Sequence, residues 1–181
     1  SQFFATDLMQ LMYGINTGET EQHYMLRISQ SAIILKLLMF SFVAISTNYI
    51  FGTLLTANHN LKQLNFIALG GLVINLSLNL ILIPYFYSIG SAWASLATQS
   101  VTALLQFLLV YKIFKFKISF KHVINLFVLI IVLITGGFVF TEFINLRWEL
   151  SFILMLISGF CVSIVLKLLN VKEFISIIKE K

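Results

Sequence analysis

Hydrophobic residues along this chain lie in long blocks that are separated by short polar breaks. Between Gly52 and Thr98, two apolar runs meet across the polar residues 58–63, and Pro84 ends the second run. A proline cannot donate a backbone hydrogen bond and it clashes with the preceding helical turn, so we expect the second helix to end there. The blocks are long enough to cross a hydrocarbon core about 30 Å thick as helices. The pattern therefore predicts membrane helices joined by tight turns.

The whole chain extends this pattern and predicts an all-α membrane protein, a polytopic helical bundle with five full transmembrane helices plus the end of a sixth. Residues 1–15 are interpreted as the end of a severed transmembrane helix, which would make the chain the C-terminal piece of a longer protein. Residues 15–31 are expected to form a surface loop, and residues 170–181 a short amphipathic helix on the membrane surface. The five spans are expected at about 32–57, 64–83, 89–111, 123–141 and 150–169.

Composition agrees with a bilayer environment. Hydrophobic residues make up 59% of the chain and charged residues only 10%, against roughly 45–50% and about 25% in soluble domains. The mean hydropathy is +0.97. The net charge of +5 comes from basic residues at the ends of apolar runs rather than in one patch, so it does not indicate nucleic-acid binding. Cys161 is the single cysteine, which excludes an intrachain disulfide.

The basic residues also predict an orientation, because Lys and Arg accumulate in cytoplasmic loops. One set of alternate loops holds nine of them, whereas the other holds only Arg27 and Arg147 together with several acidic residues. We therefore expect the 58–63 turn, the loop at 112–122 and the C-terminus to be cytoplasmic. The nine are Lys62, Lys112, Lys115, Lys117, Lys121, Lys167, Lys172, Lys179 and Lys181.

Polar residues inside the first predicted span indicate a face that does not meet lipid. Lys36 lies about one turn into this span, where its ammonium can reach the headgroups by snorkelling or can instead line a cavity and bind an anionic group. Ala32, Lys36, Phe40 and Ala44 are spaced four residues apart, and the series continues to Asn48. We expect Lys36 and Asn48 to face one cavity.

The next two spans add candidates for the cavity. Asn75 and Asn79 lie one turn apart in the second span, and they can bond to neighbouring helices or contact a sugar. Gln99 and Gln106 in the third span have the same two alternatives.

Small residues in these spans predict close helix packing. Gly70 and Gly71 would let a neighbouring backbone approach closely, and Gly90, Ala94 and Thr98 recur every four residues along one face. A tight helix–helix seam is expected along them.

No enzymatic chemistry is expected. His23, His59 and His122 fall in three separate predicted loops, so they cannot assemble a metal site. The sequence contains no nucleophile elbow, phosphate-binding glycine loop or paired membrane-embedded carboxylates. We expect no catalytic residue, metal or cofactor.

Several segments resemble a known family in order and spacing. They are GTLLTAN at 52–58, NLSLNLILIP at 75–84, IGSAWASLAT at 89–98, and the stretch from Asp7 to Gly14 with its terminal Tyr-Gly. Together they resemble the C-terminal half of polysaccharide flippases of the multidrug/oligosaccharidyl-lipid/polysaccharide exporter superfamily. The resemblance covers residues 1–112 and extends beyond them only by hydropathy.

The resemblance implies a fold, a function and a location. Family members have two pseudo-symmetric helical lobes about a central cavity and move polyprenyl-pyrophosphate-linked oligosaccharide outward across the bacterial cytoplasmic membrane. Residues 16–181 would then be the second lobe, with the missing N-terminal lobe, membrane lipid and the lipid-linked oligosaccharide as partners. A glycan polymerase or glycosyltransferases would be further partners.

Two alternatives remain open. A multidrug or cation antiporter of the same superfamily would need an acidic cation site, and Lys36 as the lone charge within the first three spans counts against it. A non-transporting membrane subunit of a polysaccharide assembly complex would not affect translocation when deleted. The flippase hypothesis predicts that Lys36→Ala abolishes glycan export without lowering protein abundance.

Overall fold

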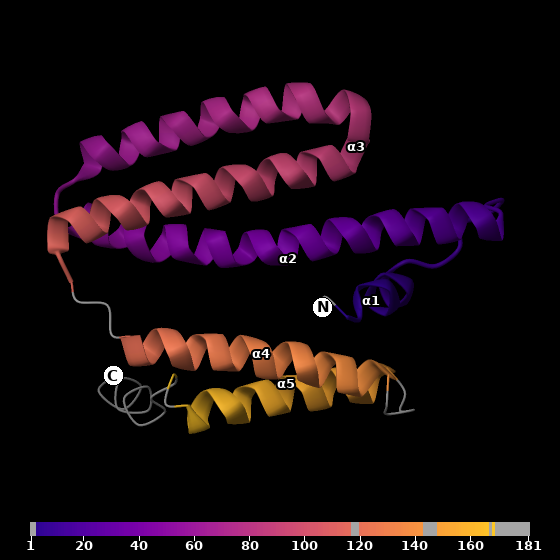
Figure 1. Cartoon of the computed structure of the whole chain (residues 1–181). Helices are drawn as coiled ribbons and strands as arrows, with labels where there is room; N and C mark the ends of the chain where they lie inside the picture. Colours follow the sequence, from indigo (N-terminus) through magenta and orange to yellow (C-terminus); the bar gives the residue numbers. More distant parts are fainter. Residues whose placement is uncertain (1–2, 117–119, 143–147, 167, 169–181) are drawn as a thin grey trace, which may run out of the picture. The chain divides into compact units, whose positions relative to one another are not determined.

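The computed structural model describes residues 3–116, 120–142, 148–166 and 168. Within these residues all the regular secondary structure is α-helical, as predicted (Figure 1). The chain forms two compact units, Ser1–Phe116 and Lys117–Lys181, which are described separately below. The helices are α1 (Ala5–Met12), α2 (Glu21–Ala57) and α3 (Leu61–Phe114) in the first unit, and α4 (Phe120–Glu142) and α5 (Trp148–Val165) in the second.

Helix α2 begins earlier than predicted, because the expected loop at 15–31 is helical from Glu21 onward. The reason is an apolar stripe at helical spacing, with Ile28 and Ala32 buried against Ala5 and Met9 of α1. Such a stripe needs only one apolar residue per turn, so it does not form the continuous apolar run that marks a membrane span. Burial against α1 therefore makes this polar-looking segment a helix.

Hydrogen bonds tie the loop between α1 and α2 to the start of α2. Arg27 donates from Nε and Nη2 to the two carboxylate oxygens of Glu19, at 3.0 and 2.8 Å, and from Nη2 to the Gly14 carbonyl at 3.0 Å. The Tyr24 hydroxyl donates to the Tyr13 carbonyl at 3.1 Å. The hydrogen bonds from Arg27 hold the pKa of the Glu19 carboxyl below its usual range.

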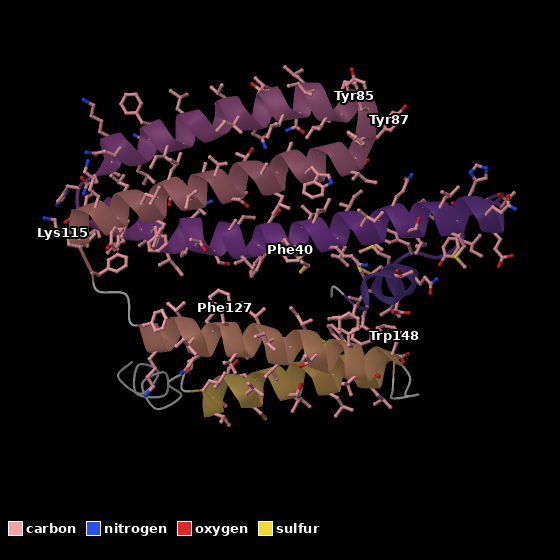
Figure 2. All side chains as sticks on the ribbon, in the orientation of Figure 1. Phe40, Tyr85, Tyr87, Lys115, Phe127 and Trp148 are labelled. Atoms are coloured by element: carbon pink, nitrogen blue, oxygen red, sulfur yellow. The ribbon has the colours of Figure 1, made fainter. Side chains whose placement is uncertain are left out.

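Helix α3 folds back on itself to form two antiparallel arms, residues 61–86 and 88–114 (Figure 1). The predicted break at Pro84 is displaced by three residues, since the helix continues through Pro84 and reverses at Tyr87, whose φ of 49° and ψ of −128° are non-helical. The proline removes one backbone hydrogen bond from the last turn of the first arm and so weakens it just before the reversal. Tyr85 and Tyr87 lie at this turn (Figure 2).

The two arms pack through small residues. Gly71 of the first arm faces the second arm, where a Cβ added to Gly71 would lie only 2.6 Å from Thr102 Cγ2. A Cβ on Gly90 would lie 2.5 Å from the carbonyl oxygen of Leu82, across the reversal. Gly70 differs from the expectation, because no atom of the described residues would lie within 4 Å of its added Cβ. The predicted seam residues Gly90, Ala94 and Thr98 are all buried, as is Thr102.

Helices α4 and α5 of the second unit pack against each other. A Cβ on Gly159 would lie 2.9 Å from Leu133 Cδ2, and Asn125 Nδ2 donates to the Leu166 carbonyl at 2.9 Å. These helices correspond to the predicted spans at 123–141 and 150–169, although the end of the second span is not fully described. The predicted amphipathic tail at 170–181 lies outside the described residues.

Three of the described helices, α2, α3 and α5, are long and apolar enough to cross a membrane. The apolar part of α4, Val123–Val139, is shorter. Helix α2 has 37 residues and a length of about 55 Å, which exceeds a hydrocarbon core of roughly 30 Å. The helices thus support a membrane protein.

Candidate functional site

Polar side chains of the apolar helices in the first unit meet where α2 contacts the second arm of α3. Asn48 of α2 is the link: its Nδ2 lies 2.9 Å from Gln99 Oε1, 3.2 Å from the Gln99 carbonyl and 3.0 Å from Thr102 Oγ1. Thr102 in turn donates toward the carbonyls of Thr98 at 2.9 Å and Gln99 at 3.0 Å. An asparagine within an apolar span is thereby given acceptors that lipid cannot supply.

The side chains of Asn48, Gln99 and Thr102 form a polar layer between the helices. The first arm of α3 adds Asn75 and Asn79 to the other side of this polar layer. Asn75 Nδ2 lies 3.4 Å from Thr98 Oγ1, a long contact that engages the donor only weakly. Asn79, one turn further on, donates to the Asn75 carbonyl at 2.9 Å and to Asn75 Oδ1 at 3.0 Å. Asn79 therefore orients the Asn75 amide group.

These residues surround a pocket that is open to the surface and has a volume of about 470 Å³. The volume falls within the roughly 300–1,000 Å³ of small-molecule sites. Helix α2 and both arms of α3 line the pocket. The lining consists of neutral amides, hydroxyls and small or aliphatic side chains. The lining residues are Asn48, Ala68, Gly71, Leu72, Asn75, Thr98, Gln99, Thr102 and Gln106.

The structure brings together three of the five predicted cavity residues, Asn48, Asn75 and Gln99. Asn79 is hydrogen-bonded to Asn75 and does not line the pocket. Lys36 is not among the lining residues either. A repeated spacing of four residues does not by itself guarantee a common face, because each step turns by about 40° around an ideal helix. From Lys36 to Asn48 the drift is about 120°, with a separation of about 18 Å along the axis.

Burial along this series is mixed. Ala32 and Ala44 are buried, whereas Phe40 between them is 57% exposed. Asn48 lines this pocket and Lys36 does not, so the pocket gives no support to the expected common face of the two residues.

Two further residues line the pocket: Thr102, which was not expected there, and Gln106, for which the sequence left a bond to a neighbouring helix and a sugar contact both open. Both continue the four-residue spacing from Thr98, so the signal was present in the seam pattern. Gln106 is only 7% exposed. Its Oε1 approaches Gly52 of α2, where an added Cβ would lie 3.5 Å away.

The lining can donate and accept hydrogen bonds but carries no formal charge. Such a set suits a neutral polar group more than an ion, because amides and hydroxyls offer both donors and acceptors. Within the part of the chain that the structure describes, no group of three His, Cys, Asp or Glu side chains could hold a metal ion.

Comparison of this chain with protein-family models, with curated proteins and with solved structures finds no match.

Proposed function

We propose that this chain is part of a multi-pass exporter that moves a polyprenyl-pyrophosphate-linked oligosaccharide, an O-antigen or capsular repeat unit, outward across the bacterial cytoplasmic membrane. The supporting observation is the open pocket lined by Asn48, Gln99 and Thr102 within otherwise apolar helices. Polar side chains are costly at membrane depth, so they tend to mark a path for a polar cargo. Amides and hydroxyls are also the groups that can exchange their mutual hydrogen bonds for bonds to sugar hydroxyls.

In this proposal α2, both arms of α3, α4 and α5 each cross the membrane. The arms of α3, residues 61–86 and 88–114, are each about 39–40 Å long and exceed the hydrocarbon thickness. Lys115 lies at the open end of α3 and Tyr85 and Tyr87 at its turn (Figure 2). Lysines favour the cytoplasmic side and tyrosines the interface, which is consistent with a cytoplasmic open end and an outer turn.

Transport would proceed by alternating access between this lobe and a second one, without covalent chemistry. The resemblance of residues 1–112 to polysaccharide flippases supports this assignment of roles. The side chains of the polar layer would hold each other in the empty state and bind the cargo when it enters.

Deletion of the gene in its host, followed by complementation, tests the proposal. Surface glycan should be lost on deletion, lipid-linked repeat units should accumulate on the cytoplasmic side, and the wild-type gene should restore export. Asn48→Leu should fail to restore it, whereas Asn65→Leu, the same change at an exposed position outside the pocket, should succeed. Lys36→Ala, at a residue that does not line the pocket, is a second variant.

Other outcomes would contradict the proposal. Unchanged surface glycan with lost efflux of cationic dyes would indicate the antiporter. Translocated but unpolymerised repeat units would indicate a subunit of an assembly complex.

A further inference from the structure

Three exposed lysines lie at one end of the first unit, away from the pocket. Lys62 is in the first turn of α3, Lys112 is in its last turn, and Lys115 follows directly after the helix. The start and the end of α3 lie at the same end of the hairpin because its two arms are antiparallel (Figure 1). Figure 2 shows Lys115 at this open end. None of the three lysines lines the pocket.

The first unit places no carboxylate at this end. Its acidic residues are Asp7, Glu19 and Glu21, which lie on α1, in the following loop and at the start of α2. The start of α2 is about 55 Å from the other end of the same helix, which leads into α3. No Asp or Glu occurs at positions 22–141 of the sequence. The counter-charge for the three lysines must therefore come from outside the unit.

The backbone of Lys115 adopts a conformation that favours glycine. Its φ of 46° and ψ of 35° are left-handed, and its N–H donates to the Tyr111 carbonyl at 2.9 Å, as in the cap that ends many helices. Glycine is usual at this position because a Cβ is disfavoured there. The next residue, Phe116, packs back on the helix, with ring centroids 5.8 Å from Tyr111 and 6.5 Å from Phe107. A lysine in a strained cap that aromatic packing holds in place points to a role for its side chain.

The three lysines also lie at the depth of lipid headgroups. Each arm of α3 is about 39–40 Å long, so an arm centred in a hydrocarbon core of roughly 30 Å extends about 5 Å beyond it on either side. Headgroups occupy that zone. Leu108 and Phe114 are exposed beside the lysines and offer apolar surface to acyl chains. A soluble anion could use only the lysines, whereas a lipid could use both the charge and the apolar surface.

We propose that Lys62, Lys112 and Lys115 form a basic patch that binds the phosphate headgroups of anionic glycerophospholipids, such as phosphatidylglycerol, in the leaflet that this end meets. Each ammonium contributes about fivefold to the affinity for an anionic surface. Lys115 is the residue that the structure assigns most directly to the headgroup, because the fold itself would favour glycine there. The inference goes beyond the proposed function and does not depend on the cargo.

Native mass spectrometry of the full chain, released from detergent micelles, tests this inference. The protein would be titrated with palmitoyl-oleoyl phosphatidylglycerol and with the phosphatidylcholine of the same acyl chains. Phosphatidylglycerol should bind saturably and at least about fivefold more tightly. Lys115→Gly, which suits the left-handed backbone but removes the charge, should weaken phosphatidylglycerol binding by about fivefold and leave phosphatidylcholine binding unchanged. Lys115→Arg, which keeps the charge, should bind phosphatidylglycerol as the wild type does.

Two controls separate the patch from net charge and from misfolding. Gln10→Glu lowers the net charge by the same one unit at an exposed position of α1, and it should not weaken phosphatidylglycerol binding. Lys115→Gly should melt without lipid at the wild-type temperature or higher, because glycine relieves the left-handed strain. Lys112→Gln leaves the cap backbone unchanged and should also lose about fivefold, so it serves as the test if Lys115→Gly does not fold.

Several results would overturn the inference. Equal affinity for the two lipids, or wild-type affinity in both Lys115→Gly and Lys112→Gln, would show that the patch does not bind headgroups. An equal loss in Gln10→Glu would show that only the net charge matters. Displacement of phosphatidylglycerol by inorganic phosphate would indicate a site for a soluble anion. A lowered melting temperature of Lys115→Gly would show that the lysine itself stabilises the cap.

Discussion

Gly70 and Gly71 are adjacent in the first arm of α3, yet a methyl group should have opposite effects at the two positions. At Gly71 the new Cβ would lie 2.6 Å from Thr102 Cγ2, whereas at Gly70 it would meet no described atom within 4 Å. Relieving the clash requires the Thr102 side chain to rotate or the two arms to separate, and Thr102 Oγ1 lies 3.0 Å from Asn48 Nδ2. Relief of the clash at Gly71 therefore breaks the polar layer.

The magnitude follows from three contributions. Replacing glycine by alanine in a helix gains about 0.5–1 kcal/mol at either position. Overpacking costs typically about 1–3 kcal/mol. A broken interhelical hydrogen bond in a membrane protein costs on average about 0.6 kcal/mol. Since the helix propensity cancels between the two variants, Gly71→Ala should be less stable than Gly70→Ala by about 1.6–3.6 kcal/mol.

Titration of the purified protein with SDS in mixed micelles, followed by tryptophan fluorescence, measures this difference. Gly70→Ala should unfold at the same SDS fraction as the wild type or at a higher one, and Gly71→Ala at a lower one. Equal stabilities of the two variants, within about 0.5 kcal/mol, would refute the close approach of the arms at Gly71, because the expected clash is at least twice as large.

Three further measurements address other parts of the first unit. Gly90→Ala should destabilise the protein more than Gly71→Ala, because its Cβ would lie 2.5 Å from a backbone oxygen, which can move less than a side chain. Size-exclusion chromatography should therefore show less monodisperse protein for Gly90→Ala. A double-mutant cycle of Asn48→Ala and Gln99→Ala should show a coupling of about 0.6–1.7 kcal/mol; purely additive effects would indicate that the hydrogen bond contributes nothing. The lowered pKa of Glu19 means that its tie to Arg27 is fully present above the unfolded pKa of about 4.3 and is lost as the pH falls through the lowered value. The protection factors of the 13–20 loop, which compare exchange with the intrinsic rate at each pH, should fall over that range, and those of Glu19→Gln should be low at every pH.

Hydrophobic periodicity was enough to predict the helical class and the reversal between residues 83 and 89, because long apolar runs and a proline act through local chemistry. It was not enough to place the reversal itself, which lies at Tyr87 rather than Pro84. A proline weakens its own turn, but the chain reverses where the two arms can pack, and that depends on the close contact of Gly90 with Leu82.

The sequence did not predict the start of α2, for a related reason. The segment from Glu21 contains few apolar residues, and it is helical because Ile28 and Ala32 bury against α1. Whether a sparse stripe forms a helix depends on a partner that lies elsewhere in the chain.

The sequence by itself determined that this chain consists of apolar helices with small residues on one face of the third span and with amides inside the spans, since residue type and spacing along one helix are local properties. Only the tertiary structure decided which amides share a site. It joined Asn48 to Gln99 and Thr102, brought Gln106 into the pocket and left Lys36 out of its lining. The physical reason is that a pocket requires side chains from separate helices to meet, and rotation around each helix and the depth along it are set by how the helices pack.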